Sequence, residues 1–425
     1  MATIAENLQT IIDSKAAIKD AIEAKGVAVG DAPLTQYASK IEEIESGGAT
    51  EEALENDVNF YDYTGFRVAS FTIEEAKALT QEQYDAILPP THEGLTFQEW
   101  NWSLEDIQTY DRQYADIGAN YITTDGNTHM NVTIDYANVE LSISGKNGTI
   151  YIDWGDGSEE SSYTFPNYKY NKNFTHTYST TSNKTITFRF QQKSEDGCYG
   201  FNEHGNGLIW NGISITEILI GAYFNASNSV GTLSNIGKKH VSITIPTYMN
   251  ATINVSATLF KQISFPRNSN LVVGYQFFLY NLGKICFPKV IKSIAASNYA
   301  FYNYIHDKIV IPAYTDDVTI SNGAFDTMQT RFVSLPACAK FAEYNVGNYL
   351  RSAFLVYVDI AQGWTPNVNM SFSTSTRWEK AYLVKFFNKL GATSTAITLT
   401  FGATNLGKLT DEEKAIATNK GYTLA

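Results

Sequence analysis

The chain is 425 residues long, a length that predicts three or four domains rather than one compact core. Hydrophobic residues make up 44% of it, and it holds 27 Tyr and 24 Phe but only 31 Lys and Arg together. This composition is typical of β-rich proteins. The net charge of -13 argues against a nucleic-acid partner, because binding a phosphate backbone needs a basic surface.

The three cysteines, Cys198, Cys286 and Cys338, lie far apart and form neither a disulfide framework nor a zinc-binding pattern. We therefore expect folding in a reducing cytosol and no cofactor. The first residues, MATIAENLQTIIDSK, lack the apolar core of a secretory signal, and no apolar run is long enough to span a bilayer. We expect neither signal-directed export nor insertion into a membrane.

Residues 1–46 are predicted to form a helical module for anchoring or oligomerisation. Heptad spacing relates the apolar residues Ile4, Leu8, Ile11, Ile18 and Ile22. Lys15 occupies another position of the same seam. A second helical stripe follows at Leu34, Tyr37, Ile41 and Ile44. Two short amphipathic helices cannot bury such stripes alone. We expect a homo-oligomer, with a trimer as the leading model; docking of single copies on another protein and a self-contained helical hairpin are the alternatives.

Residues 51–116 are predicted to form a mixed α/β adaptor segment. The run VNFYDYTGFRVASF alternates like a pair of strands around a turn at Thr64 and Gly65. Thr72 and Glu75 have the capping-box spacing of a helix start. Ser103 opens a second helical stretch.

Residues 117–195 are predicted to form an immunoglobulin-like β-sandwich, because alternating strands are separated by Gly and Asn turns. No metal site is predicted. The nearest candidates are Asp153 and Asp156, in the run DWGDG, which offer oxygen ligands to calcium. The alternative is a strand-ending turn in which the glycines adopt positive φ and the Asp side chains bond the backbone.

Residues 207–375 carry a repeat. Tetrapeptides with the form hydrophobic, any, hydrophobic, Pro end at Pro246, Pro266, Pro288, Pro312 and Pro336. These prolines are 20, 22, 24 and 24 residues apart. A short strand repeated at this interval predicts a solenoid whose units bury apolar rows against one another. Aromatic clusters at 275–280 and 299–304 are interpreted as core filling, with stacking on sugars as the alternative.

Residues 376–425 are predicted to form an α/β cap, because an open solenoid exposes its last apolar layer. A helical stripe runs from Tyr382 to Leu390, and the strand AITLTF follows it. Thr410 and Glu413 then open a short helix. The predicted fold class is mainly β with α: a helical anchor, an immunoglobulin-like sandwich and a leucine-rich-repeat solenoid with a cap.

Several of these runs resemble proteins of bacteriophages that infect gut bacteria. IAENLQTIIDSKAAIKDAIEAKGV resembles an N-terminal module of tail and fibre proteins, and VNFYDYTGFRVASFTIEEAKALT resembles the segment beside it. TIYIDWGDGS, with the later FTHTY, is similar to the PKD-type immunoglobulin-like domain. The Pro-ended repeats and LGKLTDEEKAIATNKGYTLA resemble BspA-like leucine-rich repeat proteins, although Ile, Phe and Tyr replace most leucines.

The resemblance implies a structural virion protein, made in the host cytoplasm and assembled as a tail or head fibre or other appendage. It implies capsid or tail proteins as partners, and a host cell-surface glycan or protein as the ligand, with ligand-binding residues that the sequence does not identify.

No catalytic residue is predicted. The six histidines have no metal-binding spacing, and no nucleophile elbow or phosphate-binding loop occurs in a suitable context. Cys198 and His204 are close in sequence, which says little about geometry, and His176 and Tyr178 are interpreted as packing residues. We expect a binding protein rather than an enzyme. The alternatives are a bacterial cell-surface adhesin with BspA-like repeats, which the missing signal disfavours, and a glycan depolymerase with a carboxylate pair assembled from distant residues.

Overall fold

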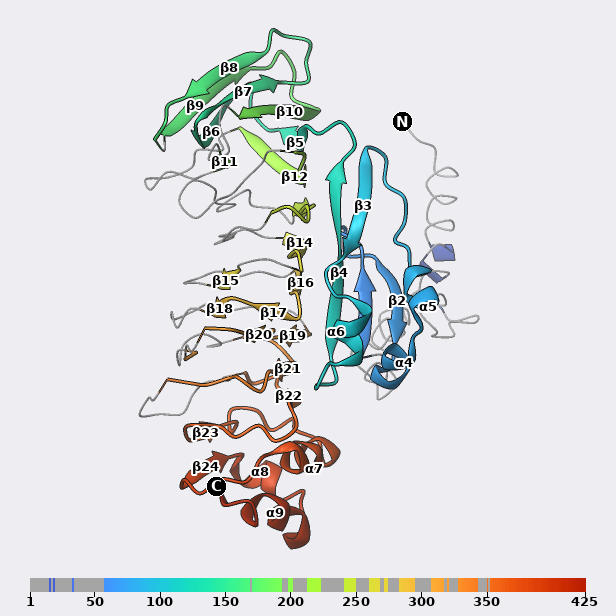
Figure 1. Cartoon of the computed structure of the whole chain (residues 1–425), viewed down its shortest axis with the longest axis vertical. Helices are drawn as coiled ribbons and strands as arrows, with labels where there is room; N and C mark the ends of the chain where they lie inside the picture. Colours follow the sequence, from blue (N-terminus) through green and yellow to red (C-terminus); the bar gives the residue numbers. More distant parts are fainter. Residues whose placement is uncertain are drawn as a thin grey trace. The chain divides into compact units, whose positions relative to one another are not determined.

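The computed structural model divides the chain into two compact units, Met1–Asn56 and Asp57–Ala425. The described residues are 15, 16, 18, 19, 33, 57–168, 170–192, 198–201, 212–222, 241–249, 260–267, 271–273, 283–294, 307–316, 319–320, 328–342, 350 and 352–425. They are mainly β and form several sheets, which confirms the expectation from composition (Figure 1).

The first sheet of the second unit has the strand order β2-β1-β4-β3. Its strands are β1 (Val58–Tyr61), β2 (Arg67–Phe71), β3 (Leu95–Trp100) and β4 (Ala115–Thr123). The antiparallel pair predicted around Thr64 and Gly65 is confirmed as β1 and β2. The predicted domain boundary at residue 116 falls inside β4 and needs correction. The run ADIGANYIT is one continuous strand between β1 and β3, so the adaptor extends to Thr123.

Three short helices accompany this sheet: α4 (Ile73–Ala78), α5 (Gln81–Asp85) and α6 (Leu104–Gln108). The capping box predicted at Thr72 and Glu75 opens α4. Ser103 opens α6, as predicted, and forms its own capping box with Asp106. Each box satisfies two backbone N–H groups that a helix start otherwise leaves without partners. These short helices are therefore defined by local sequence.

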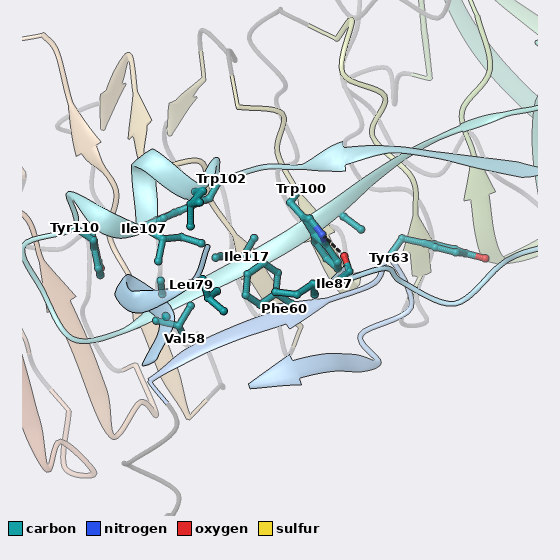
Figure 2. Packing of buried hydrophobic residues seen from close by; sticks show 14 of the residues in the cluster. Val58, Phe60, Tyr63, Leu79, Ile87, Trp100, Trp102, Ile107, Tyr110 and Ile117 are labelled. Atoms are coloured by element: carbon teal, nitrogen blue, oxygen red, sulfur yellow. Dashed lines mark hydrogen bonds between the residues drawn. The ribbon is translucent and has the colours of Figure 1, made fainter. Parts of the chain in front are cut away.

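The adaptor has a core rich in aromatic rings (Figure 2). Trp100 donates its ring N–H to the carbonyl of Ile87 at 2.8 Å, and Phe60 meets the Trp100 ring edge-on with centroids 5.0 Å apart. Ile117 and Tyr121 of β4 point into the same core. Because side chains alternate along a strand, the other face of β4 is free to meet a different part of the molecule.

The next region contains two antiparallel sheets. Its strands are β5 (Thr128–Ile134), β6 (Asn138–Lys146), β7 (Gly148–Asp153), β8 (Ser161–Phe165), β9 (Tyr170–Thr177), β10 (Asn183–Gln192) and β11 (Cys198–Phe201). One sheet contains the order β5-β10-β7-β8 and the other has the order β11-β6-β9. The sheets meet face to face: a Cβ on Gly145 would lie 2.5 Å from the Phe165 ring, and Tyr163 meets Phe174 edge-on. The strands predicted for 117–195 are thus present, but they begin at β5.

Short parallel strands follow in two rows. The first row is β12 (Ile213–Leu219), β13 (Val241–Ile243), β14 (Phe260–Ser264) and β16 (Lys284–Cys286). The second row is β19 (Lys308–Val310), β21 (Phe332–Leu335) and β22 (Tyr357–Ile360). Further parallel pairs join β15 (Val272–Val273) to β18 (Ser293–Ile294) and β17 (Val290–Ile291) to β20 (Ala313–Tyr314).

Each of the five Pro-ended tetrapeptides lies at one of these strands, as the repeat predicts. One sheet continues across the predicted boundary at residue 207. β12 pairs antiparallel with β5 and parallel with β13, so one strand belongs to both. The physical reason is that a strand has two hydrogen-bonding edges, and β12 uses a different edge for each neighbour.

The last sheet consists of β23 (Met370–Ser371), β24 (Ile397–Thr400) and β25 (Tyr422–Leu424), accompanied by α7 (Lys380–Lys389), α8 (Gly402–Leu406) and α9 (Asp411–Thr418). The apolar stripe predicted from Tyr382 lies on α7, and the capping box of Thr410 and Glu413 opens α9. The boundary at residue 376 needs correction, because β23 pairs with β24 and so belongs to this sheet.

Candidate binding surfaces

The adaptor is joined to the parallel strands by side-chain hydrogen bonds to backbone carbonyls. The Asn120 amide donates to the carbonyls of Ile245 and Ser264 at 2.8 and 3.1 Å. The Asn101 amide donates to the carbonyls of Phe265 and Cys286 at 3.1 and 2.9 Å. One amide therefore bonds two successive turns of the repeat in each case.

Two larger side chains continue the pattern. The Trp102 ring N–H donates to the carbonyl of Phe287 at 2.8 Å, and Arg112 donates to the carbonyl of Ile311 at 2.6 Å. Arg112 also reaches the Ser334 hydroxyl at 3.0 Å. We call the carbonyl oxygens of Ile245, Phe265, Phe287 and Ile311 the carbonyl row.

Every member of the carbonyl row immediately precedes the proline of a Pro-ended tetrapeptide. Proline has no N–H, so the proline of one repeat cannot donate a backbone hydrogen bond to the carbonyl at the matching position of the neighbouring repeat. A buried carbonyl without a donor costs about 1–3 kcal/mol. The donors of the adaptor satisfy this requirement at four of the five repeats. The row is thus the structural reason for the docking of the adaptor along the repeats.

Close approach of β4 to the repeats depends on Gly118. A Cβ there would lie 1.9 Å from the Ser264 hydroxyl oxygen and 2.7 Å from the Cys286 Cβ. The next repeat adds an ion pair, with the Lys308 ammonium 2.8 Å from the Asp116 carboxylate. β4 lies beside β14 and β16 in Figure 1. Small and polar side chains on this face of β4 are therefore interface residues.

A buried charged cluster joins the end of the adaptor to β22 and α7. The fully buried Asp359 carboxylate accepts hydrogen bonds from the Gln113 backbone N–H at 2.8 Å and from Lys389 at 2.5 Å. The Gln113 amide donates to Asp57 at 2.8 Å and its oxygen accepts from Lys385. Burial raises the pKa of Asp57 to about 7 and lowers the pKa of Lys385. Because these groups pair with one another, the cluster fixes the interface.

A shallow polar groove of about 310 Å³ lies over β5, β10 and β12. Its lining residues are Asn131, Val132, Thr133, Asn183, Lys184, Thr185 and Thr216. Asn131 donates to Glu217 at 2.6 Å and accepts from the Thr185 hydroxyl at 2.7 Å. Tyr63 of the adaptor donates to the other Glu217 oxygen at 2.9 Å. Amides and hydroxyls arranged in this way can orient a polar ligand.

The calcium candidates Asp153 and Asp156 both bond the chain itself. Asp153 accepts from the backbone N–H of Gly155 at 2.8 Å, and Asp156 accepts from that of Ser158 at 3.1 Å. Gly155 has a φ of +72°, which a side-chain-bearing residue rarely adopts. The observed bonds match the turn interpretation. Within the described ranges no group of three or more His, Cys, Asp or Glu side chains is arranged to hold a metal ion.

His176 completes the interactions of this turn. Its ring stacks on Trp154 with centroids 4.7 Å apart, and its Nε2 atom lies 2.8 Å from the second Asp156 oxygen. Tyr178 donates its hydroxyl to the Trp154 carbonyl at 2.9 Å. Both side chains pack against Trp154, in agreement with their interpretation as packing residues.

Several predictions fall on residues outside the described part of the chain. These are the seam residues Ile4, Leu8, Ile11 and Ile22, the candidate His204, and the aromatic clusters 275–280 and 299–304. Of the predicted anchor, Lys15 and Ile18 are helical, and Ile18 is 41% exposed. The anchor therefore stays a prediction. Cys286 and Cys338 are free thiols.

The interface residues Asn101, Arg112 and Asn120 were not predicted. One signal was available. Along ADIGANYIT the residues Asp116, Gly118 and Asn120 recur on one face, and such polar and small residues in a strand indicate contact with another polar surface. The identity of that surface cannot be read from the pattern.

Comparison with known proteins finds no matching family model, no matching curated protein and no matching solved structure. Among the described residues, no helix combines the length and the apolar character needed to cross a membrane.

Proposed function

We propose that this chain is a structural virion protein of a bacteriophage, a tail or head fibre or appendage. In this proposal residues 1–46 attach it to the particle through capsid or tail proteins. The resemblance of the N-terminal runs to phage fibre modules supports attachment. The remainder presents a surface that binds a host-cell glycan or protein, or decorates the particle.

The carbonyl row is the observation that carries this proposal. The adaptor directly follows the N-terminal unit, and its side chains bond four successive Pro-ended repeats. A module that holds residues 1–46 would thereby hold the whole array of repeats, as an appendage requires.

The proposed architecture is an immunoglobulin-like sandwich followed by a BspA-type leucine-rich-repeat solenoid with a C-terminal cap. Two facing antiparallel sheets support the sandwich. Parallel pairing of the Pro-ended strands supports the solenoid, in which each unit stacks on its neighbours. The sheet of β23, β24 and β25, with its different sequence, supports the cap.

Self-association of the N-terminal helices is part of the proposal. Ile18 exposes 41% of its surface although it belongs to the apolar seam. A seam of this width needs a partner helix, and Lys15 within it costs stability unless its amine reaches solvent or a carboxylate. We propose a homotrimer, and the measurement is the mass of the full chain in solution.

The test is removal of residues 1–46. The shortened chain should stay folded, because the chain divides into two compact units at residue 57. It should become monomeric and should fail to enter phage particles, whereas the full chain enters them. The control is thermal unfolding of both forms, which should give the same midpoint for the second unit. Normal incorporation of the shortened chain would contradict the proposed anchor.

An antibody against residues 57–425 separates the remaining classes of function. Label on purified particles supports the virion assignment. Label on the bacterial surface in the absence of phage would favour the adhesin. Release of reducing ends from capsular polysaccharide, lost on changing a single Asp or Glu, would favour the depolymerase.

A further inference from the structure

An exposed group of tyrosines lies where the two antiparallel sheets leave an open side. β8 ends the strand order of one sheet and β9 ends that of the other. Tyr163 of β8 and Tyr170 of β9 stack with centroids 5.9 Å apart and planes 23° apart. Side-chain rings, rather than backbone hydrogen bonds, therefore close the space between these edge strands.

Tyr168 and Lys172 are added to this pair. We call the four residues Tyr163, Tyr168, Tyr170 and Lys172 the tyrosine–lysine cluster. Tyr168 is 61% exposed and Tyr170 is 41% exposed. The Lys172 ammonium lies 5.2 Å from the centroid of the Tyr163 ring. Burial, and then the nearby phenols of Tyr170 and Tyr168, raises the pKa of Tyr163.

The cluster carries one cation, the Lys172 ammonium, within an acidic protein. The sequence YKYNK at 168–172 has two lysines in five residues, whereas the whole chain carries a net charge of -13. Within the described residues, the Lys172 ammonium contacts the faces of the Tyr163 and Phe174 rings and no carboxylate. Its charge is therefore available to an anionic ligand.

We propose that the tyrosine–lysine cluster binds an acidic oligosaccharide that contains hexuronic acid. The apolar face of a pyranose ring packs on the exposed rings of Tyr168 and Tyr170, and the phenol hydroxyls bond sugar hydroxyls. The sugar carboxylate pairs with the Lys172 ammonium. This inference rests on the proposed host-surface binding and deepens it by naming the ligand class and the site.

The chemistry of the cluster favours this ligand over other anions. A single placed ammonium, that of Lys172, does not neutralise a phosphate backbone. Exposed ring faces beside a cation suit a ligand with flat apolar faces and an isolated negative charge. A hexuronic acid combines both properties in one ring.

The test uses the purified full chain and oligosaccharides of polygalacturonic acid, with binding measured by calorimetry. Neutral maltohexaose and poly-L-glutamate serve as comparison ligands. We expect binding of the polygalacturonate probe that weakens as salt rises. Lys172→Gln and the double variant Tyr168→Ala, Tyr170→Ala should each weaken it about tenfold or more, a change of ~1.4 kcal/mol.

Tyr136→Ala is the matched control, because Tyr136 is 69% exposed and lies outside the cluster, between β5 and β6. It should leave the affinity unchanged. Absence of binding, equal binding of maltohexaose, or affinity unaltered by the cluster variants would overturn the proposal. Equally tight binding of poly-L-glutamate at the same residues would overturn it too and identify an acidic peptide site instead. The assay contains no phage particles, so its outcome is independent of the test of incorporation.

Discussion

The antiparallel sheets and the parallel strand rows are both β-structure, but they are stabilised in different ways. In the antiparallel region two sheets bury their inner faces against each other, as Gly145 and Phe165 show. The parallel strands are mostly two to five residues long and depend on donors from outside the repeat, such as Asn101 and Asn120. The comparison teaches that the two facing antiparallel sheets provide their own closing surface, whereas the parallel strands rely on the adaptor for one.

Introducing a charge into the core of each region should have the largest effect on stability and should destabilise a different region in each variant. Ile285 in the parallel rows and Ile150 in the antiparallel region are both buried. We expect Ile285→Asp to destabilise the parallel strands by several kcal/mol, because a buried charge without a partner is costly, and the loss should spread to neighbouring repeats. Ile150→Asp should release the antiparallel region instead.

Peptide-level hydrogen exchange distinguishes the two results. Peptides from β14 to β21 should lose protection in the Ile285→Asp variant, while peptides from β7 and β10 keep it. Unchanged thermal unfolding of Ile285→Asp would refute stacking of the repeats.

Removing one adaptor side chain that donates to the carbonyl row should have the next largest effect on stability. Asn101→Ala eliminates two hydrogen bonds to buried carbonyls, of Phe265 and Cys286, and one from the Gly118 backbone. We expect a loss of about 2–4 kcal/mol in the free energy of unfolding, measured by urea denaturation. The control Asn173→Ala removes a bond to Glu140 at the surface and should change stability by less than about 0.5 kcal/mol. Equal losses of stability in Asn101→Ala and Asn173→Ala would mean that the bonds from Asn101 to the repeats contribute no more than a surface hydrogen bond.

Asp57→Asn should alter the pH dependence of stability. The pKa of Asp57 is about 7 in the folded chain against an ordinary value of 3.8, because burial disfavours the charged form. The folded state therefore holds this proton more tightly, and stability should fall as pH rises from about 4 to 7. The amide that replaces the carboxyl group cannot ionise, so the stability of the variant relative to the wild type should rise by up to about 4 kcal/mol between pH 4 and pH 8. Parallel curves of unfolding temperature against pH would contradict this.

The smallest effect is expected in the turn of the antiparallel region. Hydrogen bonds from His176 and then from Ser158 lower the pKa of Asp156. The stability that they provide is present above the ordinary pKa of 3.8 and is lost as pH falls below it. Asp156→Asn should cost less than about 1 kcal/mol at pH 6, since solvent screens this pair. The difference between the two proteins should shrink steadily as pH falls below 3.8, and a difference that stays constant down to pH 2 would exclude ionisation as the cause.

Local sequence predicted the elements that depend on neighbouring residues. The capping boxes at Thr72 and Thr410, and the strand pair around Thr64 and Gly65, involve partners within a few positions of one another. The Pro-ended strands were predicted because their pattern recurs five times. In these cases a short stretch of sequence contains both interacting residues or one complete copy of the repeated pattern.

The adaptor interface could not be predicted in the same way. Asn101 and Phe265 are 164 positions apart, and Arg112 and Ile311 are 199 apart. Their pairing depends on which face of β4 meets the repeats, and a single chain offers no periodic signal for this. The end of the adaptor was misplaced for a related reason, because β4 pairs with both β1 and β3 and crosses the boundary drawn at residue 116.

The parallel pairing of β1 with β4 has a mechanical consequence. β1 is the first strand after the N-terminal unit, and four of its residues pair in register with β4 from Val58 and Ala115 onward. Tension applied along β1 would load these hydrogen bonds together in shear, rather than opening them one after another. β4 would then pass the pull sideways to the repeats through Asn120. The chain should therefore resist stretching from its N-terminal side much better than peeling of β2, which pairs with β1 alone.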